Sequence, residues 1–314
     1  MFLTPPIFHC AVFLPVAHFQ GTGRRFFCRA YTLRAALPPV PARAICFAHL
    51  ATPERAPPPP LFRYTDGGSQ TGDLAAPVRV GNETIYYRGH RILLAVIAAL
   101  KARGLDAATE VVVSGCSAGG LATFLHADEW GAALPNAKVT ALPDSGFFLD
   151  FNATSAGGRL GYGQLMRWVC SAMNSTGGLP AACVAANPSD PCKCIFAEHV
   201  VATAKVPLFP LQSKYDSWQI GNDLDNKDPQ AINAWGAKLQ GLVEANLLGA
   251  GRPSGVFLDS CNHHCGAWGI TIDGQPTQLA HQAWYNSLGV AGAKKEWTNN
   301  TVAYPCAACC KVGA

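Results

Sequence analysis

The sequence predicts an α/β protein in which a mostly parallel sheet is covered by helices on both faces. From about residue 85 onward, stretches with helical spacing alternate with short apolar runs that are typical of buried strands. A β-branched run at residues 111–113 also ends at a glycine-flanked serine, and a helix-compatible segment follows it. The chain has 314 residues, of which 49% are hydrophobic, so it can bury a large core.

The expected elements follow one another in a regular order. Residues 88–103 carry apolar side chains at helical spacing and stop at Gly104, residues 110–113 form a strand, and residues 121–126 continue as a helix. Further along the chain we expect three short buried strands, at residues 138–142, 206–211 and 255–258, and a helix over 231–248 that stops at Gly249 and Gly251.

The segment Gly115-Cys-Ser117-Ala-Gly119 has the pattern of a nucleophile elbow. In such an elbow, a sharp turn between strand and helix exposes a serine hydroxyl, and glycine is needed on both sides because side chains would clash. The pattern alone is weak, but the strand before it and the helix after it provide the expected context. We therefore predict that Ser117 is a nucleophile and that the amide of Ala118 contributes to an oxyanion hole.

A carboxylate and an imidazole follow the serine in the order Ser, Asp, His that α/β-hydrolases use. Asp216 comes after the strand expected at 206–211, and His264 comes after the strand expected at 255–258. The carboxyl ends of parallel strands meet at one edge of the sheet, so these side chains can converge there. A serine hydroxyl needs an imidazole to remove its proton, and the imidazole needs a carboxylate to orient it.

Alternatives exist for two of these assignments. Asp144 also follows a strand and could replace Asp216, although a structural carboxylate that binds loop amides is the preferred interpretation. His263 could replace His264, whereas Asp259 is too close in sequence to the histidines to be the usual acid. We assign the remaining candidate histidines to helices or the surface: His90, His126, His199 and His281.

The first 61 residues differ in kind from the rest of the chain. They hold six arginines, one glutamate and 11 of the 23 prolines, and we expect a disordered or wrongly predicted segment that precedes a single domain at residues 62–314. Residues 2–19 are apolar, but prolines interrupt them and no basic stretch precedes them, so neither a signal peptide nor a membrane segment is convincing. Outside this segment the charge is near neutral, which argues against nucleic-acid binding.

Cysteine usage points to a secretory route. Ten of the 13 cysteines follow residue 115, and their clusters suggest local disulfide loops: Cys183 with Cys192 and Cys194, Cys261 with Cys265, and Cys306 with Cys309 and Cys310. Four N-glycosylation sequons support the same route: Asn82, Asn152, Asn174 and Asn299. The ligand-type residues at 261–265 lack the spacing of a zinc site, so we expect no metal and no cofactor.

Several motifs together resemble the pectin acetylesterase family of plants, which belongs to one superfamily with the animal Notum carboxylesterases. The similarity runs from about residue 62 to the C-terminus, through the segments at 63–69, 87–89, 115–120, 144–150, 215–219 and 260–265. It implies an α/β-hydrolase-like fold and a triad of Ser117, Asp216 and His264, the histidine directly before the second cysteine of its motif. It also implies a short Cys261–Cys265 disulfide that braces the histidine loop.

The resemblance has one departure. Family members carry an N-terminal strand and a Gly-Gly-Gly-Trp-Cys loop that would supply further oxyanion donors, and residues 1–61 contain neither, so we expect the N-terminal part of the sheet to be missing. The implied activity is removal of acetyl groups from pectin-type polysaccharide by a secreted, monomeric cell-wall esterase. The alternatives are a Notum-like esterase for longer acyl chains and a catalytically dead relative that acts in binding.

Overall fold

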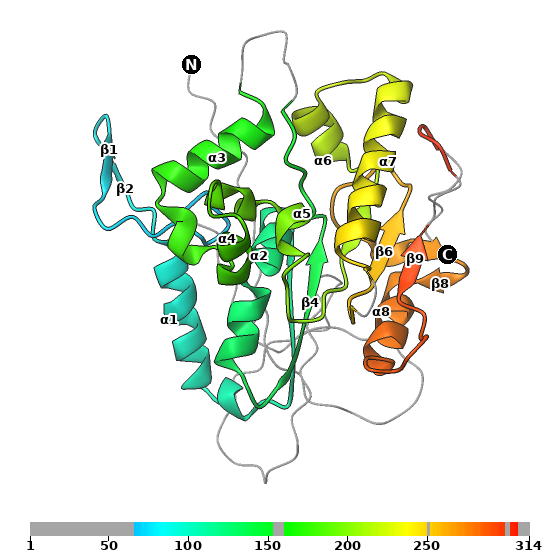
Figure 1. Ribbon diagram of the computed structural model, residues 1–314, viewed down its shortest axis with the longest axis horizontal. Helices are drawn as coiled ribbons and strands as arrows, with labels where there is room; N and C mark the ends of the chain where they lie inside the picture. Colours follow the sequence, from blue (N-terminus) through cyan, green and yellow to red (C-terminus); the bar gives the residue numbers. More distant parts are fainter. Residues whose placement is uncertain (1–65, 153–159, 250–251, 299–301, 307–314) are drawn as a thin grey trace, which may run out of the picture.

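The computed structural model describes residues 66–152, 160–249, 252–298 and 302–306 (Figure 1). The predicted N-terminal segment at 1–61 lies outside these residues, as do Asn299, Cys309 and Cys310. The boundary expected between residues 61 and 62 therefore stays a prediction.

The described residues form a five-stranded sheet in which every neighbouring pair is parallel. Its strands lie side by side in chain order: β3 (Glu110–Cys116), β4 (Lys138–Asp144), β5 (Leu211–Ser213), β6 (Val256–Asp259) and β9 (Glu296–Thr298). The predicted fold class is confirmed. Two small antiparallel pairs accompany the sheet: β1 (Val78–Val80) with β2 (Glu83–Ile85), and β7 (Thr271–Ile272) with β8 (Gln275–Pro276).

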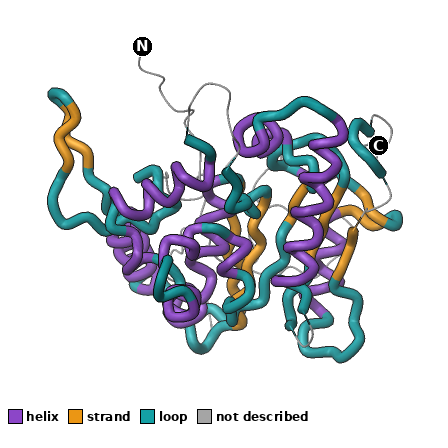
Figure 2. Tube along the Cα trace, turned by 45° about the horizontal axis from the view of Figure 1, so that its top comes forward, coloured by secondary structure: helices purple, strands orange, loops and turns teal. Residues whose placement is uncertain are grey.

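Helices fill the connections between the strands. The α-helices are α1 (Gly89–Lys101), α2 (Ala118–Ala133), α3 (Tyr162–Ala172), α4 (Ala181–Ala186), α5 (Ala197–Val200), α6 (Ser217–Gln219), α7 (Pro229–Asn246) and α8 (Thr277–Asn286). Four 3₁₀ turns lie at Leu105–Ala107, Ser175–Gly178, Pro191–Ile195 and Ala267–Gly269, and a π-helix, η4, spans Ile220–Leu224. The β1–β2 hairpin projects away from the helices in both views (Figures 1 and 2).

The core divides into one part on each face of the sheet because strand side chains alternate in direction. Val111 and Val113 of β3 join a cluster with α1, α2, α3 and α7, whereas Val112 joins a second cluster with α8. All three valines are 3% exposed or less, so each contributes about 1.5–3 kcal/mol by burial. In the described part of the chain, no helix is both long and apolar enough to cross a membrane.

The strand expected at residues 206–211 is the least accurate of the predicted elements. The segment runs beside β4 and forms one bridge, between Leu208 and Ala141, but regular pairing begins only at Leu211. Pro207 and Pro210 lack the backbone N–H that a ladder needs, which explains the late start of β5.

Two disulfides hold the helices that follow β4. Cys183 pairs with Cys194, within the predicted cluster, whereas Cys192 reaches back to Cys170 of α3. These bonds fix α3 and α4 on the turn at residues 191–195, and α3 carries one of the aromatic rings near the site described next.

Candidate active site

Ser117 lies at the junction between β3 and α2, in a backbone conformation that only a tight local fit sustains. Its φ is 59° and its ψ is −124°, a strained region for a residue with a side chain. A Cβ atom on Gly115 would lie 2.5 Å from the carbonyl oxygen of Gly119, so glycine is required where the strand and the helix approach. The turn between β3 and α2 is therefore so tight that only glycine fits at Gly115, as expected for a nucleophile elbow.

The elbow rests on the end of the neighbouring strand. The Ser117 amide donates to the Asp144 carbonyl oxygen at 2.9 Å, and a Cβ on Gly120 would approach that same oxygen to 2.4 Å. Ala118 begins α2, and a helix does not use its first amides internally. The Ala118 amide is therefore placed where an anion next to Ser117 would meet the positive end of a helix.

The structure brings Ser117, His264 and Asp216 into one hydrogen-bonded row. His264 Nε2 lies 2.8 Å from Ser117 Oγ, and His264 Nδ1 lies 2.8 and 2.9 Å from the two Asp216 oxygens. Asp216 is fully buried and also accepts the amides of Trp218 and Gln219, which makes it the N-cap of α6. A carboxylate held in this way accepts from Nδ1–H and leaves Nε2 to accept from the serine.

The alternative residues make other contacts. His263 Nε2 lies 3.1 Å from both carboxylate oxygens of Asp259. Burial lowers the pKa of His263, but the bond to Asp259 and the negative charges of Asp259, Asp144 and Asp216 together outweigh it, so the pKa is raised. Asp144 accepts the amide of Gly266 and the hydroxyl of Ser145, while its burial raises the pKa of the carboxyl. The side chains of Asp144 and His263 therefore bond to groups other than the side chains of the row.

A disulfide between Cys116 and Cys265 joins the end of β3, next to Ser117, to the loop that carries His264. The Cys261–Cys265 pair implied by the family resemblance is therefore wrong. The actual bond connects the residue before Ser117 to the residue after His264, although 149 positions separate the cysteines. The contact between Ser117 and His264 in the assembled sheet brings their neighbours Cys116 and Cys265 together, which the local clustering of cysteines does not reveal.

The same bond bears on metal binding. Among the described residues, the donor atoms of Cys116, Cys265 and Asp144 lie close enough together to hold an ion. Metal sites use thiolates, however, and the two sulfur atoms are bonded to each other. In this oxidised state the group is not equipped as a metal centre.

We expect that replacing both Cys116 and Cys265 with serine weakens both activity and stability. The bond closes a long loop, so its loss should cost about 3–5 kcal/mol of unfolding free energy. A displacement of the histidine by about 1 Å should lower kcat roughly 10²-fold. Urea denaturation and ester hydrolysis measure the two effects. The control removes the Cys183–Cys194 bond, which should lower stability and spare kcat; equal losses of kcat in both variants would contradict this expectation.

A loop before α1 supports the elbow from the other side. Ser69 Oγ donates to the Ala118 carbonyl oxygen at 3.1 Å, and His126 Nε2 lies 3.0 Å from the Ser69 carbonyl oxygen. The buried carboxylate of Asp66 accepts three backbone amides, those of Gly68, Gly72 and Gly89. The sequence motif at 63–69 indicated this loop through the family resemblance, but not its contact with Ala118.

Glu129 holds His126 in place. Its two oxygens lie 3.1 Å from His126 Nδ1 and 2.9 Å from His90 Nε2. Burial alone would raise the pKa of Glu129, but the two histidines lower it to about 2. The Glu129 carboxylate is therefore charged, and it fixes the side chain that contacts Ser69.

Two aromatic rings border the imidazole of His264, and a third packs against both of them. The centroids of Phe148 and Trp218 lie 6.3 and 6.2 Å from the His264 centroid, and Tyr162 of α3 packs against both rings. Trp218 meets Phe148 edge-on at 5.2 Å. We call Phe148, Tyr162 and Trp218 the aromatic wall.

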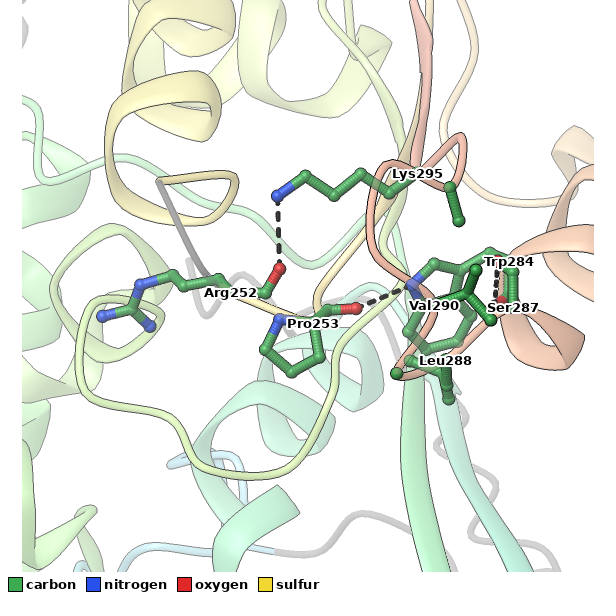
Figure 3. Close-up of a pocket in the computed structure, with 9 residues that line it drawn as sticks. Arg252, Pro253, Trp284, Ser287, Leu288, Val290 and Lys295 are labelled. Carbon is green, nitrogen blue, oxygen red and sulfur yellow. Dashed lines mark hydrogen bonds between the residues drawn. The ribbon is translucent and has the colours of Figure 1, made fainter.

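A separate pocket lies at the opposite edge of the sheet (Figure 3). Arg252 and Pro253 precede β6, and Lys295 precedes β9, so this pocket is near the amino ends of the strands. Lys295 Nζ donates to the carbonyl oxygens of Leu248 and Arg252, and Trp284 Nε1 donates to that of Pro253. Its polar groups serve to hold loops together.

A parallel sheet with a serine on a strained strand–helix turn, and with Asp and His after later strands, defines an α/β-hydrolase-like protein. The model of one family, described as pectinacetylesterase, matches residues 61–311. The chain therefore belongs to the pectinacetylesterase family, as the sequence motifs suggested.

Curated relatives agree with this assignment. Pectin acetylesterase 11 of Arabidopsis thaliana is 34% identical over 223 residues, which cover 65% of this chain and 56% of that protein. Pectin acetylesterase 4 of the same plant is 28% identical over 278 residues, covering 80% and 65%. The palmitoleoyl-protein carboxylesterase NOTUM of Drosophila melanogaster is 28% identical over 65% of this chain and 31% of that protein. The chain spans only about half to two thirds of the plant relatives that it matches.

A solved structure shares the fold. The Wnt deacylase Notum from Drosophila superposes with a TM-score of 0.63 at 26% sequence identity, covering 72% of this chain and 67% of that one. The relatives named here are carboxylic ester hydrolases, of polysaccharide in one branch and of an acylated protein in the other.

Proposed function

We propose that the chain is a serine carboxylesterase that removes acetyl groups from pectin-type polysaccharide. The observation that carries this proposal is the hydrogen-bonded row of Ser117, His264 and Asp216 at the carboxyl edge of the sheet, in a member of the pectinacetylesterase family. The proposed site comprises these three residues, the oxyanion donor Ala118, and the elbow glycines Gly115 and Gly119.

The reaction would proceed through an acyl-enzyme. His264 Nε2 takes the proton from Ser117 Oγ, which attacks the ester carbonyl, while Asp216 stabilises the imidazolium. The Ala118 amide donates to the oxyanion of the tetrahedral intermediate. The intermediate collapses, His264 returns its proton to the departing sugar hydroxyl, and an activated water then releases acetate.

The aromatic wall supports a short acyl group. Phe148 and Trp218 are close to the imidazole of His264, and they meet edge-on. We propose that the acyl group of the substrate lies against this wall, where an acetyl group would fit and a long acyl chain would need the rings to move. This favours acetyl esters over the longer chains that a Notum-like activity would require.

Acetate release from acetylated pectin, together with a p-nitrophenyl series from acetate to octanoate, tests this function. We expect the wild type to prefer acetate, and Trp218→Ala to raise the octanoate-to-acetate ratio of kcat/KM at least about tenfold. Trp168→Ala is the matched control because Trp168 is 56% exposed on α3. A folded wild type with no turnover would refute the esterase, and a preference for octanoate would instead favour the Notum-like activity.

We also propose that the protein is secreted and glycosylated. Three disulfides lie among the described residues, and Asn82, Asn152 and Asn174 are exposed there. Both features suit the oxidising route to a cell wall. A shift in mass after removal of N-glycans from the secreted protein would test the modification.

A further inference from the structure

Asp223 is a buried carboxyl group that has no role in the proposed reaction. It lies on η4, seven residues after Asp216, and none of its surface is exposed. In the part of the chain that the structure describes, neither of its oxygens accepts a hydrogen bond. A buried carboxylate must be paired or neutralised, because an isolated buried charge is very costly.

The surroundings of Asp223 favour neutralisation. Burial raises the pKa of Asp223 well above the ordinary value, and the nearby negative charge of Asp216 raises it further. The elements packed against η4 are α6, α3 and α7. The cationic side chains on these helices have other partners: Arg167 of α3 binds Asp150, and Lys238 of α7 lies over the Phe151 ring. The charge that acts on Asp223 is therefore that of Asp216.

A buried acceptor is available one helical turn earlier. Gln219 Nε2 donates to the Phe147 carbonyl oxygen at 3.3 Å, whereas Gln219 Oε1 is buried without a partner in the described structure. Gln219 is the N-cap of the π-helix η4, in which hydrogen bonds join residues five positions apart, so it lies about one turn before Asp223. A protonated carboxyl group has one O–H to donate. A hydrogen bond from Asp223 to Gln219 would satisfy both groups at once.

This bond would complete a chain of contacts that leads back to Asp216. The Phe147 amide donates to Gln212 Oε1 at 3.0 Å, and Gln212 Nε2 lies 3.4 Å from Asp216 Oδ2. The Gln219 amide also donates directly to Asp216 Oδ1 at 3.0 Å. Gln219 thus supports the Asp216 carboxylate in two ways: directly through its amide, and indirectly through Phe147 and Gln212. Its side-chain oxygen Oε1 lacks only a hydrogen-bond donor.

We propose that Asp223 is a positioning residue that works as a neutral carboxylic acid: it donates to Gln219, braces Asp216 from behind, and releases that brace when it loses its proton. Its effect on catalysis rests on the proposed esterase function, whereas its effect on stability does not.

Four proteins test the proposal: the wild type, Asp223→Asn, Asp223→Leu and the control Asp225→Asn, which removes the same charge from an exposed position.

The first measurement is Tm against pH. The folded protein holds the proton of Asp223 more tightly than the unfolded chain, so its stabilising effect is complete below about pH 4 and is lost as the pH rises towards the raised pKa. Asparagine keeps a donor and cannot ionise. We therefore expect Asp223→Asn to match the wild type near pH 4 and to exceed it by about 2–5 °C for each further pH unit, until the wild-type carboxyl ionises. A difference in Tm between Asp223→Asn and the wild type that stays constant with pH would overturn the proposal.

The second measurement is the pH profile of p-nitrophenyl acetate hydrolysis. Asp223→Asn should retain kcat at alkaline pH where the wild type declines, and Asp223→Leu, which has no donor, should lower kcat about tenfold or more at unchanged KM. Wild-type kcat that is as resistant to alkali as that of Asp223→Asn would contradict the brace. If none of the four proteins hydrolyses esters, the proposed function fails, but the Tm profiles still show whether Asp223 is protonated. The Tm profiles of the wild type and Asp223→Asn also decide the question when Asp223→Leu does not fold.

Discussion

Ser117→Ala is expected to abolish ester hydrolysis, with kcat reduced about 10⁴- to 10⁶-fold. In the proposed reaction, the hydroxyl is the only group of the row that forms a bond to the acyl group, and removing a serine nucleophile from a triad costs this much in other serine hydrolases. The variant should remain folded because alanine fits the space, and removing the side-chain oxygen from a strained residue leaves the elbow glycines unchanged.

Acetate release and p-nitrophenyl acetate hydrolysis measure this loss. Ser217→Ala is the control, because Ser217 is an exposed serine directly after Asp216 and its side chain belongs to no part of the proposed site. Equal activity of wild type and Ser117→Ala would mean that another residue or a contaminant performs the hydrolysis. Incubation with an organophosphate should label the wild type once and leave Ser117→Ala unlabelled.

Asp216→Asn is expected to lower kcat about 10⁴-fold while the fold persists. An asparagine amide can present its NH₂ group to His264 Nδ1, and the imidazole then carries its proton on Nε2, where it cannot accept from Ser117. Asparagine remains a good N-cap, so α6 should keep its first turn.

Steady-state kinetics and thermal melting separate the two effects of this substitution. The matched control is Asp228→Asn, which makes the same exchange at the N-cap of another helix, α7, on a residue outside the row. That variant should retain kcat, and both variants should melt near the wild type. Full activity of Asp216→Asn would exclude Asp216 as the acid of the triad and would favour Asp144 in that role.

The sequence could predict those features that depend on local pattern. The β-branched run before Ser117 and the order of Asp216 and His264 depend on strand signals and chain order, and both signals are visible in one dimension. The position of β5 was predicted less well, because the apolar side chains around Pro207 and Pro210 indicate burial but do not show which amides are available for pairing.

Features that depend on the assembled sheet could not be predicted in this way. The partner of Cys265 lies 149 residues away, and local clustering pointed instead to its neighbour Cys261. Similarly, Asp223 reads as an ordinary polar residue in the segment Asn222-Asp-Leu-Asp225. Its burial becomes visible only when η4 packs between α3 and α7.

The Cys116–Cys265 bond also has a consequence for how the site is held together. The native sheet sets the two cysteines side by side although β4 and β5 lie between β3 and β6, so the native topology favours this bond over other pairings. Once formed, the bond holds the segments that carry Ser117 and His264 together by a covalent link as well as by packing. Reduction would remove that link and leave the spacing of the two residues to non-covalent contacts alone.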